Sequence, residues 1–124
     1  MTRINVGIPP KQLTRQHLIA EHREIKRVPN VIAKGKFNLK GQPKEFTLGT
    51  GHVKFFYDKL GYLKKRYEEI YVECRSRGYD VTYYGDAWND VPKNMMGDYQ
   101  PTSKDIEIIT ERIKQKNKKY ERFN

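Results

Sequence analysis

The start of the chain carries a candidate nucleophile. Residue 2 is threonine, and a small residue at this position favours removal of the initiator methionine, so we expect Thr2 to present a free α-amine. The pKa of an α-amine is about 8, well below the value of about 10.4 for lysine, so part of it is unprotonated at neutral pH. Nearby arginines would lower that pKa further. Such an amine can attack a sugar carbon and form an imine (a Schiff base).

A second segment offers the acid and the phosphate ligands that this chemistry needs. At about 100° per residue, one side of a helix would carry Gln16, Ala20, Arg23, Glu24 and Arg27. Arginines bind phosphates, and a carboxylate can stabilise positive charge that develops on a sugar. The same residues also fit a surface salt-bridge cluster, in which Glu24 offsets the repulsion between Arg23 and Arg27. The pattern alone leaves both interpretations open.

Charge favours a nucleic-acid partner for this chemistry. The chain has 124 residues, a hydrophobic content of 36% and a formal net charge of +10. Residues 1–66 hold 15 Lys and Arg against 4 Asp and Glu, whereas residues 67–124 are nearly balanced. A basic surface concentrated around a site favours a polyanion through counterion release, although a basic surface can also serve solubility alone. We expect one domain over residues 1–124 that binds nucleic acid.

Other features argue against several classes of protein. The single cysteine, Cys74, excludes an internal disulfide and a cysteine zinc site, and we expect it to be buried on a helix. His17 and His22 do not share a helical face, so we expect no metal site. No apolar run approaches the ~18 residues of a membrane span, and the start lacks the apolar stretch of a signal peptide. We therefore expect a cytoplasmic protein without a membrane partner.

The residues with candidate chemistry must be positioned by an arm and a first helix. We expect an all-α fold, a single compact domain of three main helices with long irregular connections. Residues 1–10 form an extended arm that ends at Pro9-Pro10, and a helix follows over residues 11–27. Because proline disfavours α geometry at the residue before it, we expect a kink or break at Val28, after which the helix can resume as far as Lys34.

Two further helices complete the predicted fold. Gly49-Thr50-Gly51 introduces the longest helix, over residues 52–77, with Gly78 as its C-cap. Residues 79–101 contain scattered Gly and Pro and are expected to be irregular. The last helix is expected to begin near Ser103, as an N-cap, and to run to about Lys119. Apolar side chains recur at helical spacing in the long helix and are expected to form the core: Val53, Phe56, Tyr57, Leu60, Leu63, Tyr67, Ile70 and Tyr71.

Several motifs together resemble a known family, the phage-type endonuclease V enzymes, which are pyrimidine-dimer DNA glycosylases with AP lyase activity. The resemblance covers most of the chain. The most specific matches are the start Met1-Thr2-Arg3-Ile4-Asn5, the helix motif Gln16-His17-Leu18 with Arg23-Glu24 and Arg27, and Gly51-His52-Val53 followed by Phe55-Phe56-Tyr57-Asp58-Lys59-Leu60.

The resemblance implies a role for each matching residue. Thr2 would supply the α-amine that displaces the damaged base and forms the imine, and Glu24 would stabilise charge on the sugar and assist β-elimination. No cofactor would be needed. The substrate would be double-stranded DNA containing a damaged base, bound by a monomer. The residues implied to bind DNA are Arg3, Gln16, His17, Arg23, Arg27, Arg112 and Lys116.

The end of the chain departs from the family pattern. The aromatic-rich tail is missing, Phe123 falls about where a tryptophan is expected, and the chain's tryptophan is Trp88. This departure affects the choice of lesion more than the lyase chemistry. Two alternatives therefore stay open: the same chemistry on another damaged or modified base, and a non-catalytic protein that bends DNA. The resemblance also suggests a phage genome, and hence action in the host cytoplasm.

Overall fold

The computed structural model describes residues 3–123, with side chains as far as residue 117. Thr2 and the side chains after Asn117 lie outside this description. Residues 3–123 form helices and contain no strand, with one isolated bridge between Lys59 and Met96, so the predicted all-α class is confirmed. The α-helices are α1 (Arg15–Glu24), α2 (Arg27–Ala33), α3 (His52–Phe55), α4 (Leu60–Ser76) and α5 (Ser103–Phe123); the 3₁₀ turns are Pro10–Gln12, Gly85–Trp88 and Lys93–Met95.

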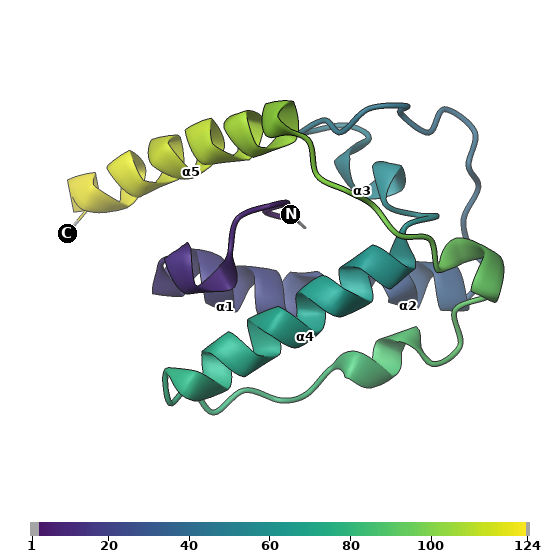
Figure 1. Cartoon of the computed structure of the whole chain (residues 1–124), viewed down its shortest axis with the longest axis horizontal. Helices are drawn as coiled ribbons and strands as arrows, with labels where there is room; N and C mark the ends of the chain where they lie inside the picture. The colour runs from purple at the N-terminus through teal and green to yellow at the C-terminus, as the bar shows by residue number, and fades with distance from the viewer. Residues whose placement is uncertain (1–2, 124) are drawn as a thin grey trace.

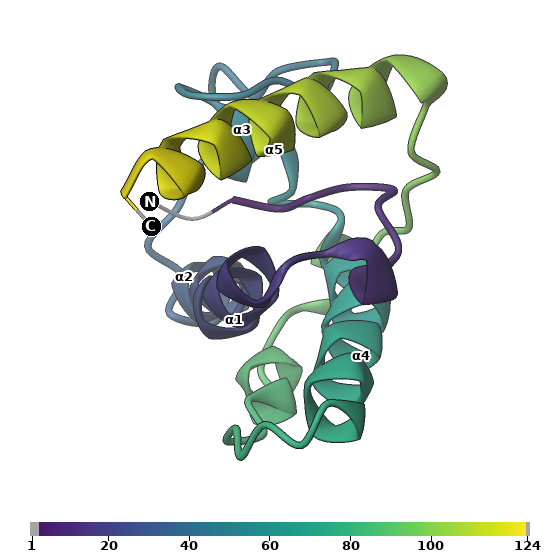
Figure 2. The ribbon, with the colours of Figure 1, turned by 90° about the vertical axis from the view of Figure 1, so that its left-hand side faces the viewer.

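The helices form layers around the N-terminal arm. Helices α1 and α4 contact each other, and α2 packs on the turn Gly85–Trp88. The arm runs between α5 on one side and α1 with α4 on the other, as the two perpendicular views show (Figures 1 and 2). No helix within residues 3–123 is long and apolar enough to cross a membrane.

Two buried clusters of side chains hold these layers together. The larger cluster combines Ile4 and Val6 of the arm with side chains of α2, α3 and α4, including the fully buried Tyr67. The smaller cluster lies between α1 and α4 and contains Leu18 and Cys74. Cys74 is buried on a helix as predicted, and burial raises the pKa of its thiol. Because the arm contributes to the larger core, its backbone is fixed by packing.

The first predicted helix is shorter at its start and breaks three residues earlier than expected. Residues 10–12 form a 3₁₀ turn, and α1 begins at Arg15 rather than Lys11. The break falls at residues 25–26, between α1 and α2, and not at Val28. Pro29 instead lies in the first turn of α2, where backbone N–H groups have no helical partner and a missing N–H costs little.

The predicted long helix over residues 52–77 is two helices, α3 and α4. Between them, the Asp58 carbonyl accepts a hydrogen bond of 3.1 Å from the Gly97 N–H, and the Gly97 carbonyl accepts one of 3.1 Å from the Tyr62 N–H. These bonds to a distant segment replace helical ones. The approach is close, because a Cβ on Gly61 would lie 2.6 Å from the Met96 carbonyl oxygen. The helix is therefore interrupted by a tertiary contact that helical periodicity does not reveal.

The last helix begins with a reciprocal cap one residue before the predicted one. Thr102 Oγ1 accepts a hydrogen bond of 3.1 Å from the Asp105 N–H, and the Asp105 carboxylate accepts one of 3.1 Å from the Thr102 N–H. Ser103 is the first helical residue rather than the N-cap, and α5 continues to Phe123, past the predicted end at Lys119. This capping box fixes where α5 leaves the core.

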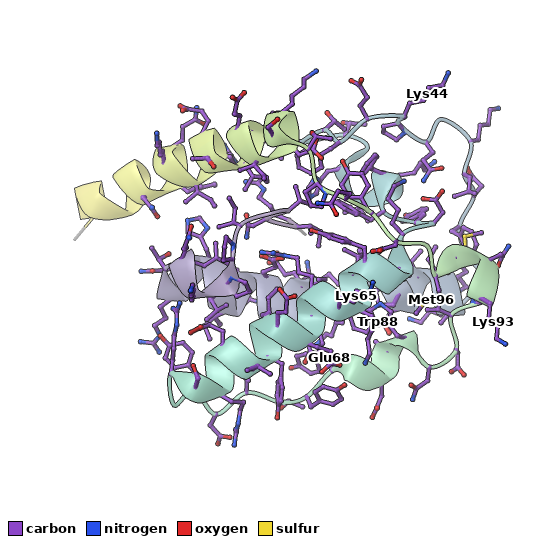
Figure 3. All side chains as sticks on the ribbon, viewed as in Figure 1. Lys44, Lys65, Glu68, Trp88, Lys93 and Met96 are labelled. Carbon is purple, nitrogen blue, oxygen red and sulfur yellow. The ribbon has the colours of Figure 1, made fainter. Side chains whose placement is uncertain are left out.

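Residues 79–101 are mostly irregular, as predicted, but they are tied to the core. Trp88 is buried, and its Nε1 donates a hydrogen bond of 3.0 Å to the Leu60 carbonyl. Figure 3 shows Trp88 beside α4 and Met96 near the start of that helix. The turn Gly85–Trp88 therefore closes the core against α4 and α2.

Candidate functional site

The arm is attached to α3 by a histidine. The Ile4 N–H donates a hydrogen bond of 2.9 Å to His52 Nε2, and His52 Nδ1 lies 2.8 Å from the Thr47 carbonyl oxygen. A carbonyl only accepts, so we assign the ring proton to Nδ1, which leaves Nε2 as the acceptor for Ile4. Burial lowers the pKa of His52, which keeps the imidazole neutral.

A buried ion pair attaches the arm to α1 and α4. Glu21 and Arg66 are almost fully buried, and both Nε and Nη2 of Arg66 donate to the Glu21 carboxylate. Asn5 Nδ2 donates a third hydrogen bond to this carboxylate, at 2.7 Å, and Arg66 Nη1 donates one of 3.0 Å to the Ile8 carbonyl. The arm is thus held at residues 4, 5 and 8 by three different helices.

Glu24 lies at the end of α1, three residues after Glu21 and beside an exposed arginine. Its side chain is 12% exposed, whereas that of Arg23 is 59% exposed, and Arg23 Nη2 lies 3.4 Å from Glu24 Oε1. A carboxylate that is mostly shielded from water but still reaches the surface can act on a substrate that displaces the remaining solvent. The predicted pairing of Glu24 with an arginine of α1 is therefore present.

The outer face of α1 forms an open groove of about 530 Å³. It joins three residues of the predicted face, Gln16, Ala20 and Arg23, with Arg15 and Ile19. Sequence reasoning missed Arg15, although it lies eight residues before Arg23, close to two helical turns. Arg27 does not line this groove; it is exposed on α2, beyond the break. The groove offers guanidinium and amide groups of the kind that bind a nucleic-acid backbone.

A second groove, of about 380 Å³, lies between the arm, residues 48–49 and α5. Arg3 of the arm and Arg112 of α5 both line it, although they lie near opposite ends of the sequence. The Nε of Arg112 is buried and has no hydrogen-bond partner within the described part of the chain. Two guanidinium groups converging on one groove suit a phosphate, which offers several acceptor oxygens.

His17 connects α1 to α5. Its Nε2 lies 3.1 Å from Asn117 Oδ1, and burial lowers its pKa, with further lowering from nearby Arg3 and Lys116. The imidazole is half-buried, so it supports the junction between the two helices. Arg3, His17 and Lys116 are therefore close enough to interact, although they are far apart in the sequence.

The sequence matches the protein family described as "Pyrimidine dimer DNA glycosylase" over residues 1–84. The chain belongs to this family. The matched range contains the arm and helices α1 to α4, including Glu24, and it ends before α5. This DNA glycosylase therefore acts on DNA, and the resemblance stated from its motifs is confirmed at the level of the family.

In this glycosylase six of the seven residues predicted to bind DNA fall into three places. Gln16 and Arg23 share the α1 groove, and Arg3 and Arg112 share the α5 groove. His17 and Lys116 lie at the junction of α1 and α5, and Arg27 stands apart on α2. Sequence reasoning missed His52, Glu21 and Arg66. The available signal was a carboxylate and a guanidinium on the otherwise apolar faces of α1 and α4. Among the described residues no group of three or more His, Cys, Asp or Glu is placed to hold a metal ion.

Proposed function

We propose that this glycosylase cleaves the glycosidic bond of one base of a pyrimidine dimer in duplex DNA and then cleaves the strand through an imine on the α-amine of Thr2. The observation that carries the proposal is the anchoring of the arm within two residues of Thr2. Ile4 and Asn5 are buried and hydrogen-bonded, while Arg3 lines the α5 groove. A terminal segment without a function does not need such anchors, whereas a nucleophile must be held in a fixed position relative to its substrate.

The proposed reaction begins with displacement of the base. The unprotonated amine donates its lone pair to C1′ of the deoxyribose, the bond from C1′ to the base breaks, and the base leaves with that electron pair and takes up a proton. The nitrogen, after losing a proton, then forms a double bond to C1′ while the bond from C1′ to the ring oxygen breaks. The ring oxygen keeps that electron pair and takes up a proton to become a hydroxyl, which leaves a protonated imine. Glu24, shielded from water on α1, stabilises the positive charge that develops on the sugar.

Strand cleavage follows from the imine. A base removes a proton from C2′, the bond from C3′ to its phosphate oxygen breaks, and the 3′ phosphate leaves as the anion. We assign the transfer of this proton to Glu24. Hydrolysis of the remaining imine returns the free amine. No cofactor takes part in any of these steps.

The DNA backbone would be held by the two grooves. We assign phosphate contacts to Arg23 and Gln16 on α1, to Arg27 on α2, and to Arg3, Arg112 and Lys116 around α5. Binding on both sides of the arm would favour a kinked duplex in which a nucleotide is flipped out. Unstacking costs a few kcal/mol and is cheapest where pairing is already damaged, which adds selectivity for lesions. We propose that a monomer does this, in the cytoplasm of a phage-infected cell.

Borohydride trapping on UV-irradiated duplex tests the proposal. We expect a covalent protein–DNA adduct with the wild-type chain, because borohydride reduces the imine to a stable amine. The variant Glu24→Gln should lose cleavage of the glycosidic bond, and with it the adduct, while its DNA dissociation constant stays within about threefold of wild type. Glu45→Gln, on an exposed carboxylate near the start of α5, is the matched control and should behave as wild type.

Different substrates separate the remaining alternatives. A panel of duplexes carrying a cyclobutane dimer, an oxidised purine or an abasic site distinguishes the proposed lesion from another damaged base. Absence of adduct on every duplex, with binding that weakens steeply as salt rises, would instead indicate a DNA-bending protein and refute the proposed chemistry.

A further inference from the structure

We propose that His52 is a positioning residue for the reaction, because its neutral imidazole holds the arm in place and a proton gained at Nε2 releases it. This inference rests on the proposed function of the arm. It assigns a purpose to a buried histidine that the proposed reaction does not itself use.

The geometry around His52 leaves Nε2 one hydrogen bond to make, as the acceptor for the Ile4 N–H. The residue is 4% exposed, and the rings of Phe46 and Phe56 pack against the imidazole with centroids 5.4 and 5.6 Å away. Nδ1 is occupied by the Thr47 carbonyl, so the ring cannot rotate to offer another acceptor. The Ile4 N–H is therefore met by a group whose position is fixed by a turn and two aromatic rings.

Protonation would turn this attraction into a clash of donors. A proton on Nε2 would point at the Ile4 N–H, and neither group could accept a hydrogen bond. The buried N–H would lose its partner, which favours detachment of the arm from the core. Because Ile4 lies two residues from Thr2, detachment would release the part of the arm that leads to the proposed nucleophile.

The charged groups around the ring act in opposite directions. Burial lowers the pKa of His52, Arg3 of the arm lowers it further, and Glu21 of α1 raises it, with Arg66 of α4 paired to that carboxylate. The folded protein thus keeps the ring neutral down to a pH below the ordinary histidine value of 6.5. Below that point we expect the arm to detach and the reaction to slow.

Two substitutions separate positioning from simple stability. Phe in His52→Phe keeps a flat ring but removes the acceptor, whereas Gln in His52→Gln offers an amide oxygen to Ile4 and an N–H to Thr47 and does not titrate. The matched control is His22→Gln, a comparably buried histidine bonded to Tyr67 rather than to the arm. Single-turnover borohydride trapping, DNA binding and amide exchange of Ile4 are measured from pH 5 to pH 8.

We expect His52→Phe to trap DNA about tenfold more slowly than wild type at pH 7–8, because one buried hydrogen bond is lost, with its DNA dissociation constant within about threefold of wild type. This difference should shrink toward pH 5, as His52 of the wild-type chain becomes protonated and loses the same bond. His52→Gln should restore part of that rate and flatten the acid side of the pH profile, which His22→Gln should leave unchanged. In the wild-type protein, the protection of the Ile4 amide should fall as the ¹⁵N signals of His52 report protonation.

Trapping by His52→Phe at the wild-type rate, or an Ile4 amide whose protection ignores the titration of His52, would overturn the positioning role. The wild-type exchange experiment needs no variant, so it decides the matter even where a substituted chain fails to fold. Failure of the proposed function gives a different pattern: the wild-type chain would form no adduct, while Ile4 protection would still follow His52.

Discussion

The buried pair between Glu21 and Arg66 provides the sharpest test of how the arm is held. Their side chains are 0% and 5% exposed, and the Glu21 carboxylate accepts hydrogen bonds from Arg66 and Asn5. Replacing Glu21 by Gln would leave the guanidinium charge buried without a counter-ion. Breaking such a pair costs about 3–5 kcal/mol, and we expect about 3 kcal/mol because the amide oxygen still accepts one hydrogen bond.

Urea unfolding measures this loss. With a denaturant slope of about 1.5 kcal/mol/M, the midpoint should fall by about 2 M. Glu45→Gln is again the control, because its partner Lys104 lies 3.8 Å away and both side chains are mostly exposed, so the loss should stay below about 1 kcal/mol. A Glu21→Gln protein within about 1 kcal/mol of wild type would refute the reasoning, since the pair would then contribute no more than a surface one.

Three further outcomes follow from other parts of the fold. Gly61→Ala should lower the melting temperature by about 5 °C or more, because its Cβ would meet the Met96 carbonyl, and calorimetry measures this change. The control Val72→Ala, on a residue that is 63% exposed, should leave the melting temperature nearly unchanged. The free energy of unfolding should fall as pH drops below 6.5, because burial lowers the pKa of His52 and the unfolded chain takes up the proton first. Urea unfolding at pH 7.5 and at pH 5 measures this change, and equal stability at the two pH values would contradict it. Cys74 should resist iodoacetamide in native protein at pH 8 and react in urea, which mass spectrometry would record.

Local signals in the sequence located most of the elements. The glycine after α4 has a φ of +83°, which fits its predicted place at the end of the helix, and Pro9-Pro10 does mark the end of the arm. The apolar spacing predicted eight core residues, of which Phe56, Leu60, Leu63, Tyr67 and Ile70 are buried, whereas Val53, Tyr57 and Tyr71 are partly buried against the core. These features depend on neighbours in the chain, so a single sequence is enough to show them.

Features that depend on distant contacts were missed. The break between α3 and α4 arises from hydrogen bonds to Gly97, some forty residues away, and no local pattern marks it. The anchoring of Ile4 by His52 joins residues 48 apart, and the motif that contains His52 predicted only the start of a helix. His17 was expected near DNA through resemblance, yet its bond to Asn117 depends on where α5 lies.

The candidate site shows the same division. Helical spacing placed Gln16, Ala20 and Arg23 together, and they line one groove. It also placed Arg27 on that face, but the break at residues 25–26 moves Arg27 to a separate helix. Spacing along one helix could not bring Arg3 and Arg112 to the same groove, since that requires the arm to lie beneath α5.

The central claim is that the nucleophile is the amine at the start of the chain, and peptide mapping of the borohydride-trapped adduct tests it most directly. After digestion, we expect mass spectrometry to find the reduced sugar on the α-nitrogen of Thr2, and an added N-terminal residue to suppress trapping. A sugar attached to a lysine, or unchanged trapping by the extended chain, would contradict the claim.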